Sequence, residues 1–413
     1  MLKAALARRL ARPRRLSAIA WLALPLLLLI AAYVLHANPS VDLEHRLEKM
    51  DFTNYWVGSK LILGGRAMEL FSGQQSYFAA LREFAGPDIG WHNWSYPPHY
   101  LFFIMPFGLF GYLPAAAVFL ALTLCIYLHA VSLSARGSRM LLLLLLLPAI
   151  LGNVVFIQNG FLISALFVYG LTLRQSRPVL AGIALGMLTI KPQLGFLLPI
   201  LLIFERRWTV MLSATATASM MIGLAALIWG PQAWVGYFTV NLPYQGDVML
   251  HLTGIFTHMM PSVYGSLRAL SVAPDTALLA HLPVALLSFI AYLICLRRTD
   301  GLQARATATV FATFMISPYS LIYDFCALAA VAALAVVSAV ETGALNRRNG
   351  LIGLVPLFVV CLLPLLTLPL ALAGLPVSPV IIAFGWFAAM RSTQTGNSRP
   401  FPPYTAEKNN GTV

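Results

Sequence analysis

Three charged side chains stand inside or at the edge of apolar stretches of this sequence, and together their types could carry chemistry. They are Asp51, Lys191 and Asp324. A carboxylate can take a proton from a hydroxyl group, and a lysine can stabilise negative charge that develops on a leaving phosphate. Because a charge at membrane depth costs about 3 kcal/mol or more, each of these residues needs a partner or a functional role.

Asp51 stands near the start of the segment MDFTNYWVGSKLILGG at 50–65. A helix that begins near it places Tyr55, Gly58 and Ile62 on the same face as the carboxylate, which could then act as a base beside an aromatic ring. Alternatively, Asp51 is the N-cap of this helix. Hydrogen bonds from backbone N–H groups would then lower its pKa and make it a poor base. The two roles do not exclude each other.

Lys191 lies midway along the apolar stretch 178–204, directly before Pro192 and Gln193. At that depth it needs an anion, a water-filled cavity or a helix break near the surface. Pro192 favours such a break because it lacks a backbone donor. We interpret Lys191 as functional; the alternative is a lysine that reaches the surface from a short loop between two half-length helices.

Asp324 and three more polar residues interrupt apolar sequence in two motifs. Tyr323 and Asp324 end the motif SPYSLIYD, where Asp324 is either a functional carboxylate or a helix cap. Gln158 and Asn159 stand in FIQNGFLISALF, either as a polar turn between two spans or as hydrogen-bonding partners of a lipid phosphate or another helix.

The motif NWSYPPHY at 93–100 is aromatic and proline-rich. Proline suits the first turn of a helix, where its missing N–H has no partner. We interpret Trp94 and Tyr96 as anchors at the membrane interface, with His99 able to meet a headgroup.

The composition identifies an integral membrane protein. Of 413 residues, 59% are hydrophobic and only 10% are charged, against roughly a quarter in soluble domains. The net charge of +13 gathers in the first fifteen residues and in short basic loops, which predicts membrane topology rather than nucleic-acid binding. The four cysteines stand singly in apolar sequence, so we expect no disulfide and no metal site.

The apolar stretches predict an all-α polytopic bundle of about ten to twelve spans. We assign residues 1–390 to one membrane domain, with an uncleaved first span and a cytoplasmic, disordered tail at 391–413. Two long outer loops, 37–97 and 231–274, are predicted on the non-cytoplasmic side, with helices at 51–63 and 74–85 in the headgroup layer. The candidate spans are 17–36, 98–113, 114–134, 139–157, 161–173, 178–204, 209–230, 275–296, 304–319, 322–340, 350–371 and 376–390.

Five motifs in order carry a resemblance to a known family: DFTNYWVGSKLILGG, YPP, QNG, KPQ and SPYSLIYD. Together they resemble glycosyltransferase family 87, membrane enzymes of the GT-C class that include polyprenol-phosphate-mannose-dependent mannosyltransferases. The resemblance runs from about residue 45 to 330. The sequence lacks a P-loop, a dinucleotide fingerprint, a metal-binding histidine pair and a nucleophile elbow, so no soluble nucleotide donor is indicated.

The resemblance implies a GT-C bundle in a bacterial inner membrane, with the catalytic aspartate, Asp51, in a periplasmic loop. The donor would be a mannose, or another hexose or pentose, on polyprenyl phosphate, and the acceptor a lipid or glycan. Neither a cofactor nor a metal is expected. Tyr323 and Asp324 stand where the mannosyltransferase branch usually carries a histidine, so the reaction type carries over but not the sugar.

The chemistry of an inverting transfer can be assigned to candidate residues. Asp51 would be the base, because such a transfer needs one within reach of the acceptor hydroxyl. The candidate cations or hydrogen-bond donors for the leaving phosphate are Lys191, Arg268, His251 and His258, and of these we prefer Lys191. Candidates for the substrate pocket are Tyr55, Trp56, Tyr96, His99, Gln158, Asn159, Gln193, Tyr323 and Asp324. The alternative function is a transporter or flippase of lipid-linked sugars, which would also need a cationic, aromatic cavity; we see no internal duplication of the kind such proteins carry.

Overall fold

The predicted all-α class is confirmed. The computed structural model describes residues 50–135, 137–342 and 350–394, and within these ranges every regular element is a helix. The predicted first span at 17–36, the basic residues before it and residues 395–413 of the predicted tail lie outside the described residues. The last described helix, α21 (Ser378–Gln394), extends four residues into the predicted tail at 391–413.

Six helices of the described ranges are long and apolar enough to cross a membrane, so the protein is a polytopic helical membrane protein. They begin and end close to the spans predicted from hydropathy. One of them, Ile322–Glu341, consists of the 3-10 turn Ile322–Phe325 followed by α19 (Cys326–Glu341). The other five are α7 (Tyr112–Ser134), α8 (Arg139–Phe156), α12 (Trp208–Trp229), α17 (Pro274–Arg298) and α20 (Gly350–Leu372).

The six helices differ in how much of their surface the bundle covers. The span at Ile322–Glu341 is 94% buried, and small alanine side chains let its neighbours approach closely. α12 is only 17% buried, and Leu227 on it is 82% exposed, as expected of a helix that faces lipid. The remaining bundle helices are shorter: α9 (Gly160–Leu173), α10 (Pro178–Met187), α11 (Leu198–Phe204), α18 (Leu302–Ile316) and α21.

Two predicted spans are not continuous helices. The stretch 178–204 breaks between α10 and α11, where 3-10 turns flank Lys191, so the helix break predicted from Pro192 is confirmed. The predicted span 98–113 is wrong. It consists of the 3-10 turn Pro98–Tyr100, α6 (Leu101–Ile104) and the 3-10 turn Met105–Leu109, because Pro106 cannot continue the hydrogen-bond ladder of α6.

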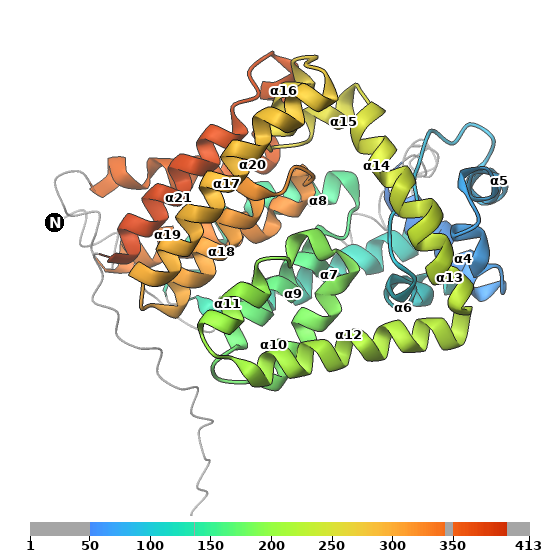
Figure 1. The fold of residues 1–413 in the computed structure, drawn as a ribbon, viewed down its shortest axis with the longest axis horizontal. Helices are drawn as coiled ribbons and strands as arrows, with labels where there is room; N and C mark the ends of the chain where they lie inside the picture. The colour runs from blue at the N-terminus through green and yellow to red at the C-terminus, as the bar shows by residue number, and fades with distance from the viewer. Residues whose placement is uncertain (1–49, 136, 343–349, 395–413) are drawn as a thin grey trace, which may run out of the picture.

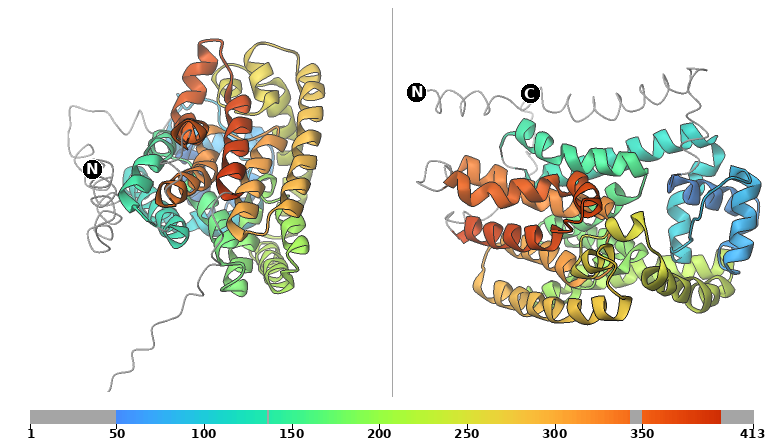
Figure 2. Two further views of the ribbon diagram at one scale, coloured as in Figure 1. Left: turned by 90° about the vertical axis from the view of Figure 1, so that its left-hand side faces the viewer. Right: turned by 90° about the horizontal axis from the view of Figure 1, so that it is seen from above.

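The described part of the segment predicted as the first outer loop contains the two predicted helices, α4 (Phe52–Leu63) and α5 (Gln74–Ala85). The second contains α13 (Pro231–Gly236), a π turn (Tyr237–Asn241), α14 (Leu242–His251), α15 (Ile255–His258) and α16 (Val263–Ala269). In Figure 1, α4 and α5 lie at one end of the molecule beside α13 and α14, while α17 to α21 gather at the other end. The view from above in Figure 2 shows the same division.

An aromatic cluster fills the space between α4, α5 and the segment 94–100. Tyr96 stacks on Tyr100 at a ring-centroid distance of 4.2 Å, and Trp94 packs edge-on against Tyr96 at 5.6 Å. Trp94 is 1% exposed and Tyr96 8% exposed. The interpretation of these two residues as interface anchors is therefore wrong: offset and edge-on ring contacts bury them inside the protein.

Candidate functional site

Asp51 is the N-cap residue of α4, but its carboxylate does not cap the helix. Instead, Gln158 Nε2 donates a hydrogen bond to Asp51 Oδ2 at 2.7 Å. Within the described ranges the structure gives Oδ1 no hydrogen-bond partner, and the side chain is partly exposed. Asp51 thus occupies the predicted N-cap position without the predicted capping hydrogen bonds, and one carboxylate oxygen is left to meet a ligand.

The amide of Gln158 is held in one orientation. Tyr55 Oη and the backbone N–H of Asn159, the latter at 3.2 Å, both donate to Gln158 Oε1. Because two donors point at this oxygen, the Nε2 group must face Asp51. Asn153 Nδ2 also donates to the backbone carbonyl of Gln158 at 3.0 Å. The polar turn predicted between two spans is confirmed, and its side chain fixes the carboxylate.

The turn brings α8 and α9 close to the start of the span at Ile322–Glu341. A Cβ at Gly160, the first residue of α9, would collide with the backbone carbonyl of Tyr323. Only glycine permits this approach, which explains the third letter of the QNG motif in this chain. Asn159 Nδ2 donates to Tyr100 Oη at 3.3 Å and ties the same turn to the aromatic cluster.

Lys191 is 6% exposed and forms an ion pair with Asp324, with 2.5 Å between Nζ and Oδ1. The other oxygen of Asp324 accepts the backbone N–H of Leu321 at 3.1 Å, so this carboxylate both caps the 3-10 turn and holds the lysine. The ammonium also lies 5.1 Å from the ring centre of Tyr323. The charge that the sequence placed at membrane depth is therefore paired, as its cost requires.

The charges of Asp51 and of the Lys191–Asp324 pair influence the pKa values of groups in the site. Burial raises the pKa of Asp51 above its ordinary value of 3.8, while the hydrogen bond from Gln158 and the charges of His92 and Lys191 oppose the rise. Burial also raises the pKa of Tyr96, and the charges of Asp324 and Asp51 both add to that rise. The charges of Asp51 and Asp324 thus both act on the pKa of the same tyrosine.

The structure places the remaining candidates for the substrate pocket, His99, Trp56 and Gln193, in three different settings. His99 Nε2 is 3.2 Å from Thr189 Oγ1 and its ring stacks on Trp234; burial lowers the pKa of His99 to about 4. Trp56 Nε1 donates to the backbone carbonyl of Phe110 at 3.1 Å, a contact with the 3-10 turn rather than with Gln158. Gln193 is half-buried in the turn after Lys191.

The other three predicted phosphate ligands bond to nearby backbone. Arg268 donates to the carbonyls of Val272 and Leu250 at 2.8 and 3.1 Å. His251 Nδ1 lies 3.1 Å from the carbonyl of Asp247, four residues earlier. His258 Nδ1 lies 2.7 Å from the carbonyl of Gly254. These contacts do not bring the three residues to the Lys191–Asp324 pair.

Sequence reasoning missed His92, which is 6% exposed and whose charge acts on Asp51. Its Nδ1 and Nε2 lie 3.0 and 3.3 Å from the carbonyls of Gly90 and Met50. A single histidine in an irregular loop has no periodicity that could place it. Only its position beside aromatic residues in WHNW could have drawn attention.

Comparison with known proteins gives one match. The model of glycosyltransferase family 87 matches residues 94–318, more than half of the chain. No curated protein and no solved structure matches. The matched range includes Gln158 and Lys191, begins after Asp51 and ends before Asp324. The geometry above thus belongs to a multi-pass membrane protein with a glycosyltransferase sequence signature, and the chain is a member of glycosyltransferase family 87.

Proposed function

We propose that this glycosyltransferase transfers a sugar from a polyprenyl-phosphate donor to a hydroxyl group of an envelope glycolipid or polysaccharide, with inversion at the anomeric carbon. The reaction takes place at the periplasmic face of a bacterial inner membrane. The observation that supports this most directly is the carboxylate of Asp51, oriented by one fixed hydrogen bond and partly exposed.

Asp51 is the base in this proposal. The acceptor hydroxyl oxygen attacks the anomeric carbon while its proton passes to the free oxygen of Asp51. The bond between the anomeric carbon and the phosphate oxygen breaks, and both of its electrons stay with the phosphate. A raised pKa suits this role, since a stronger base takes the proton more readily.

Lys191 stabilises the leaving group. The donor phosphate carries one negative charge as a diester and gains a second as the sugar departs. An ammonium has three N–H donors, and Asp324 takes one of them. The others can meet phosphate oxygens, so the fixed cation acts most strongly on charge that develops in the transition state. Asp324 keeps the cation in place when no donor is bound.

A direct test supplies purified protein with matched donors. Each sugar is offered once on polyprenyl phosphate and once on a nucleotide, with membrane glycolipids as acceptors. We expect transfer from the lipid-linked donors alone, and a product whose anomeric configuration, read by NMR, is inverted. Equal transfer from nucleotide sugars, or a retained configuration, would overturn the proposal.

A further inference from the structure

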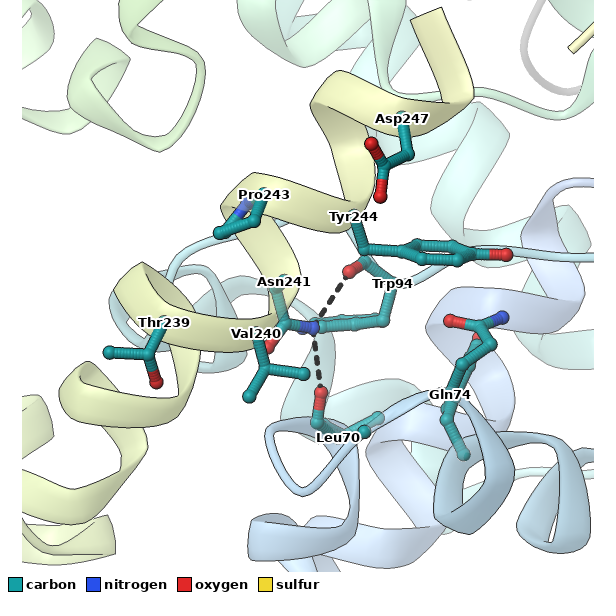
Figure 3. A pocket seen from close by; sticks show the side chains of 11 residues that line it. Leu70, Gln74, Trp94, Thr239, Val240, Asn241, Pro243, Tyr244 and Asp247 are labelled. Atoms are coloured by element: carbon teal, nitrogen blue, oxygen red, sulfur yellow. Dashed lines mark hydrogen bonds between the residues drawn. The ribbon is translucent and has the colours of Figure 1, made fainter. Parts of the chain in front are cut away.

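A pocket of about 280 Å³ lies between the first and second outer loops, on the side of the molecule that carries α4 and α5. Figure 3 shows its walls: α14 and the π turn on one side and the residues around Gln74 on the other. Three of its lining residues are at least partly exposed and could recognise a ligand, namely Gln74, Tyr244 and Asp247, whereas Tyr77, Trp94 and Asn241 are buried in its wall.

The lining disfavours an anionic ligand. None of the described residues that line this pocket is a lysine, an arginine or a histidine, and Asp247 contributes an exposed carboxylate. A phosphate would meet a negative charge there without a cation to balance it. Drug-sized ligands occupy pockets of roughly 300–1,000 Å³, so this volume suits a single small group and not a lipid chain.

Two buried polar atoms of the lining residues have no partner in the described ranges. They are Trp94 Nε1, a donor, and Asn241 Oδ1, an acceptor. Asn241 Nδ2 donates to the carbonyls of Leu70 and Trp94, both at 2.9 Å, and these two bonds fix the orientation of the amide. Both atoms are buried in the wall, so the polar groups that a ligand in the pocket meets are those of Gln74, Tyr244 and Asp247. A sugar hydroxyl is both donor and acceptor and can bond to each of them.

An accessible aromatic face beside amide, carboxylate and hydroxyl groups is the chemistry that binds a neutral sugar ring. The C–H face of a sugar covers a ring, and its hydroxyls bond to the polar atoms around it. Tyr244 is the most accessible of the three rings, and its hydroxyl accepts a hydrogen bond from Trp91 Nε1 at 3.0 Å. This contact holds the ring at the edge of the pocket.

The inner wall of the pocket is connected to the segment that carries Asp51. Gln74 Nε2 donates to the carbonyl of His92 at 2.8 Å, and the ring of His92 contacts the carbonyl of Met50, the residue before Asp51. Tyr77 donates its hydroxyl to the side chain of Asn54 in the first turn of α4. Two lining residues of the pocket are thus connected to the start of α4, where Asp51 lies, through His92 and through Asn54.

We propose that this pocket binds a neutral sugar unit of the acceptor, separately from the anionic donor, and so positions the acceptor for transfer. The proposal extends the function proposed above, in which Asp51 takes the proton of the acceptor hydroxyl.

Saturation-transfer NMR with simple methyl glycosides tests this binding without donor or turnover. The probes are the methyl glycosides of mannose, glucose, galactose and arabinose, with the protein in a detergent that has no sugar headgroup. We expect at least one to bind the wild type, and Tyr244→Ala to raise its Kd about tenfold as the stacking ring is lost. Tyr244→Phe keeps the ring and should bind within about twofold of the wild type, although both variants lose the bond from Trp91.

Charge gives a second, independent readout. The methyl glycoside of glucuronic acid should bind the wild type more weakly than the neutral glucoside, and Asp247→Ala should reduce this discrimination. Asp88→Ala, an equal change at an exposed position outside the pocket, should leave both affinities unchanged. No binding to the wild type, or equal binding by the wild type and Tyr244→Ala, would overturn the proposal.

Asp51→Asn separates the two proposals, because it should bind the glycosides as the wild type does while it loses transfer. If Asp51→Asn keeps transfer and Tyr244→Ala still loses binding, the base assignment falls and the pocket stands. If Tyr244→Ala binds normally while Asp51→Asn loses transfer, only the pocket falls.

Discussion

Replacement of Gln158 by leucine tests how the base is tuned. The change removes the 2.7 Å hydrogen bond from Gln158 Nε2 to Asp51 Oδ2. This bond stabilises the ionised carboxylate, so its loss raises the pKa of Asp51 above the already raised value. Activity requires the ionised base, and it falls as the pH drops through this pKa. The acid limb of the pH profile of kcat/KM must therefore move to higher pH.

The size of the shift follows from the bond that is lost. A hydrogen bond to a charged group contributes about 1.5–3 kcal/mol, and one pKa unit corresponds to about 1.4 kcal/mol. Because Asp51 is partly exposed, water replaces some of the bond, and we expect the low end, about one unit. At pH values below the acid limb, a rise of one unit in the pKa lowers the rate about tenfold.

The assay is transfer from the donor that the wild type prefers, measured across pH 4 to 8, roughly the range in which a raised carboxyl pKa is visible. Gln158→Glu is a second variant, since its carboxylate still accepts from Tyr55 and Asn159 but offers Asp51 no amide donor. Its like charge should move the limb further. Gln232→Leu, the same change at an exposed position on α13, is the matched control. An acid limb that stays in place in both Gln158 variants would refute the reasoning.

Two further predictions concern the elements that hold the site. Lys191→Met should lower kcat about 100-fold or more and, because it leaves the carboxylate of Asp324 buried and unpaired, destabilise the fold by about 3–5 kcal/mol, measured by thermal unfolding. The double variant Lys191→Met, Asp324→Leu should recover stability without recovering transfer; recovered transfer would show that the pair is only structural. Gly160→Ala should destabilise by about 1–3 kcal/mol because its Cβ meets the carbonyl of Tyr323, whereas Gly223→Ala, in open space within α12, should be stabilising by about 0.5–1 kcal/mol. Equal melting temperatures of the two glycine variants would contradict this account of the turn.

Much of the fold could be predicted because it depends on local sequence. The long apolar stretches gave spans whose ends match α12 and α17 within about two residues, and Pro192 marked the break beside Lys191. Where local signals conflicted, prediction failed. The stretch 98–113 is apolar enough to span, but Pro106 and the contact of Gly108 with the backbone of Ser59 make it a set of short turns.

The site could be predicted only in part, because its contacts join distant segments. The sequence marked Lys191 and Asp324 as charges that needed explanation, but not that they pair across 133 positions. It marked Asp51 and Gln158 separately, and left the capping role of Asp51 open. The contact between them is set by tertiary packing, as are the burial of Trp94 and the position of His92. Local propensity carries no information on such contacts.

The central claim is that Asp51 takes the proton of the acceptor hydroxyl, and the turnover of Asp51→Asn tests it most directly. With Asp88→Asn as a matched control and unfolding monitored in parallel, we expect kcat to fall about 100- to 10,000-fold in Asp51→Asn alone, without loss of folded protein. Turnover of Asp51→Asn within a few-fold of the wild type would contradict the claim.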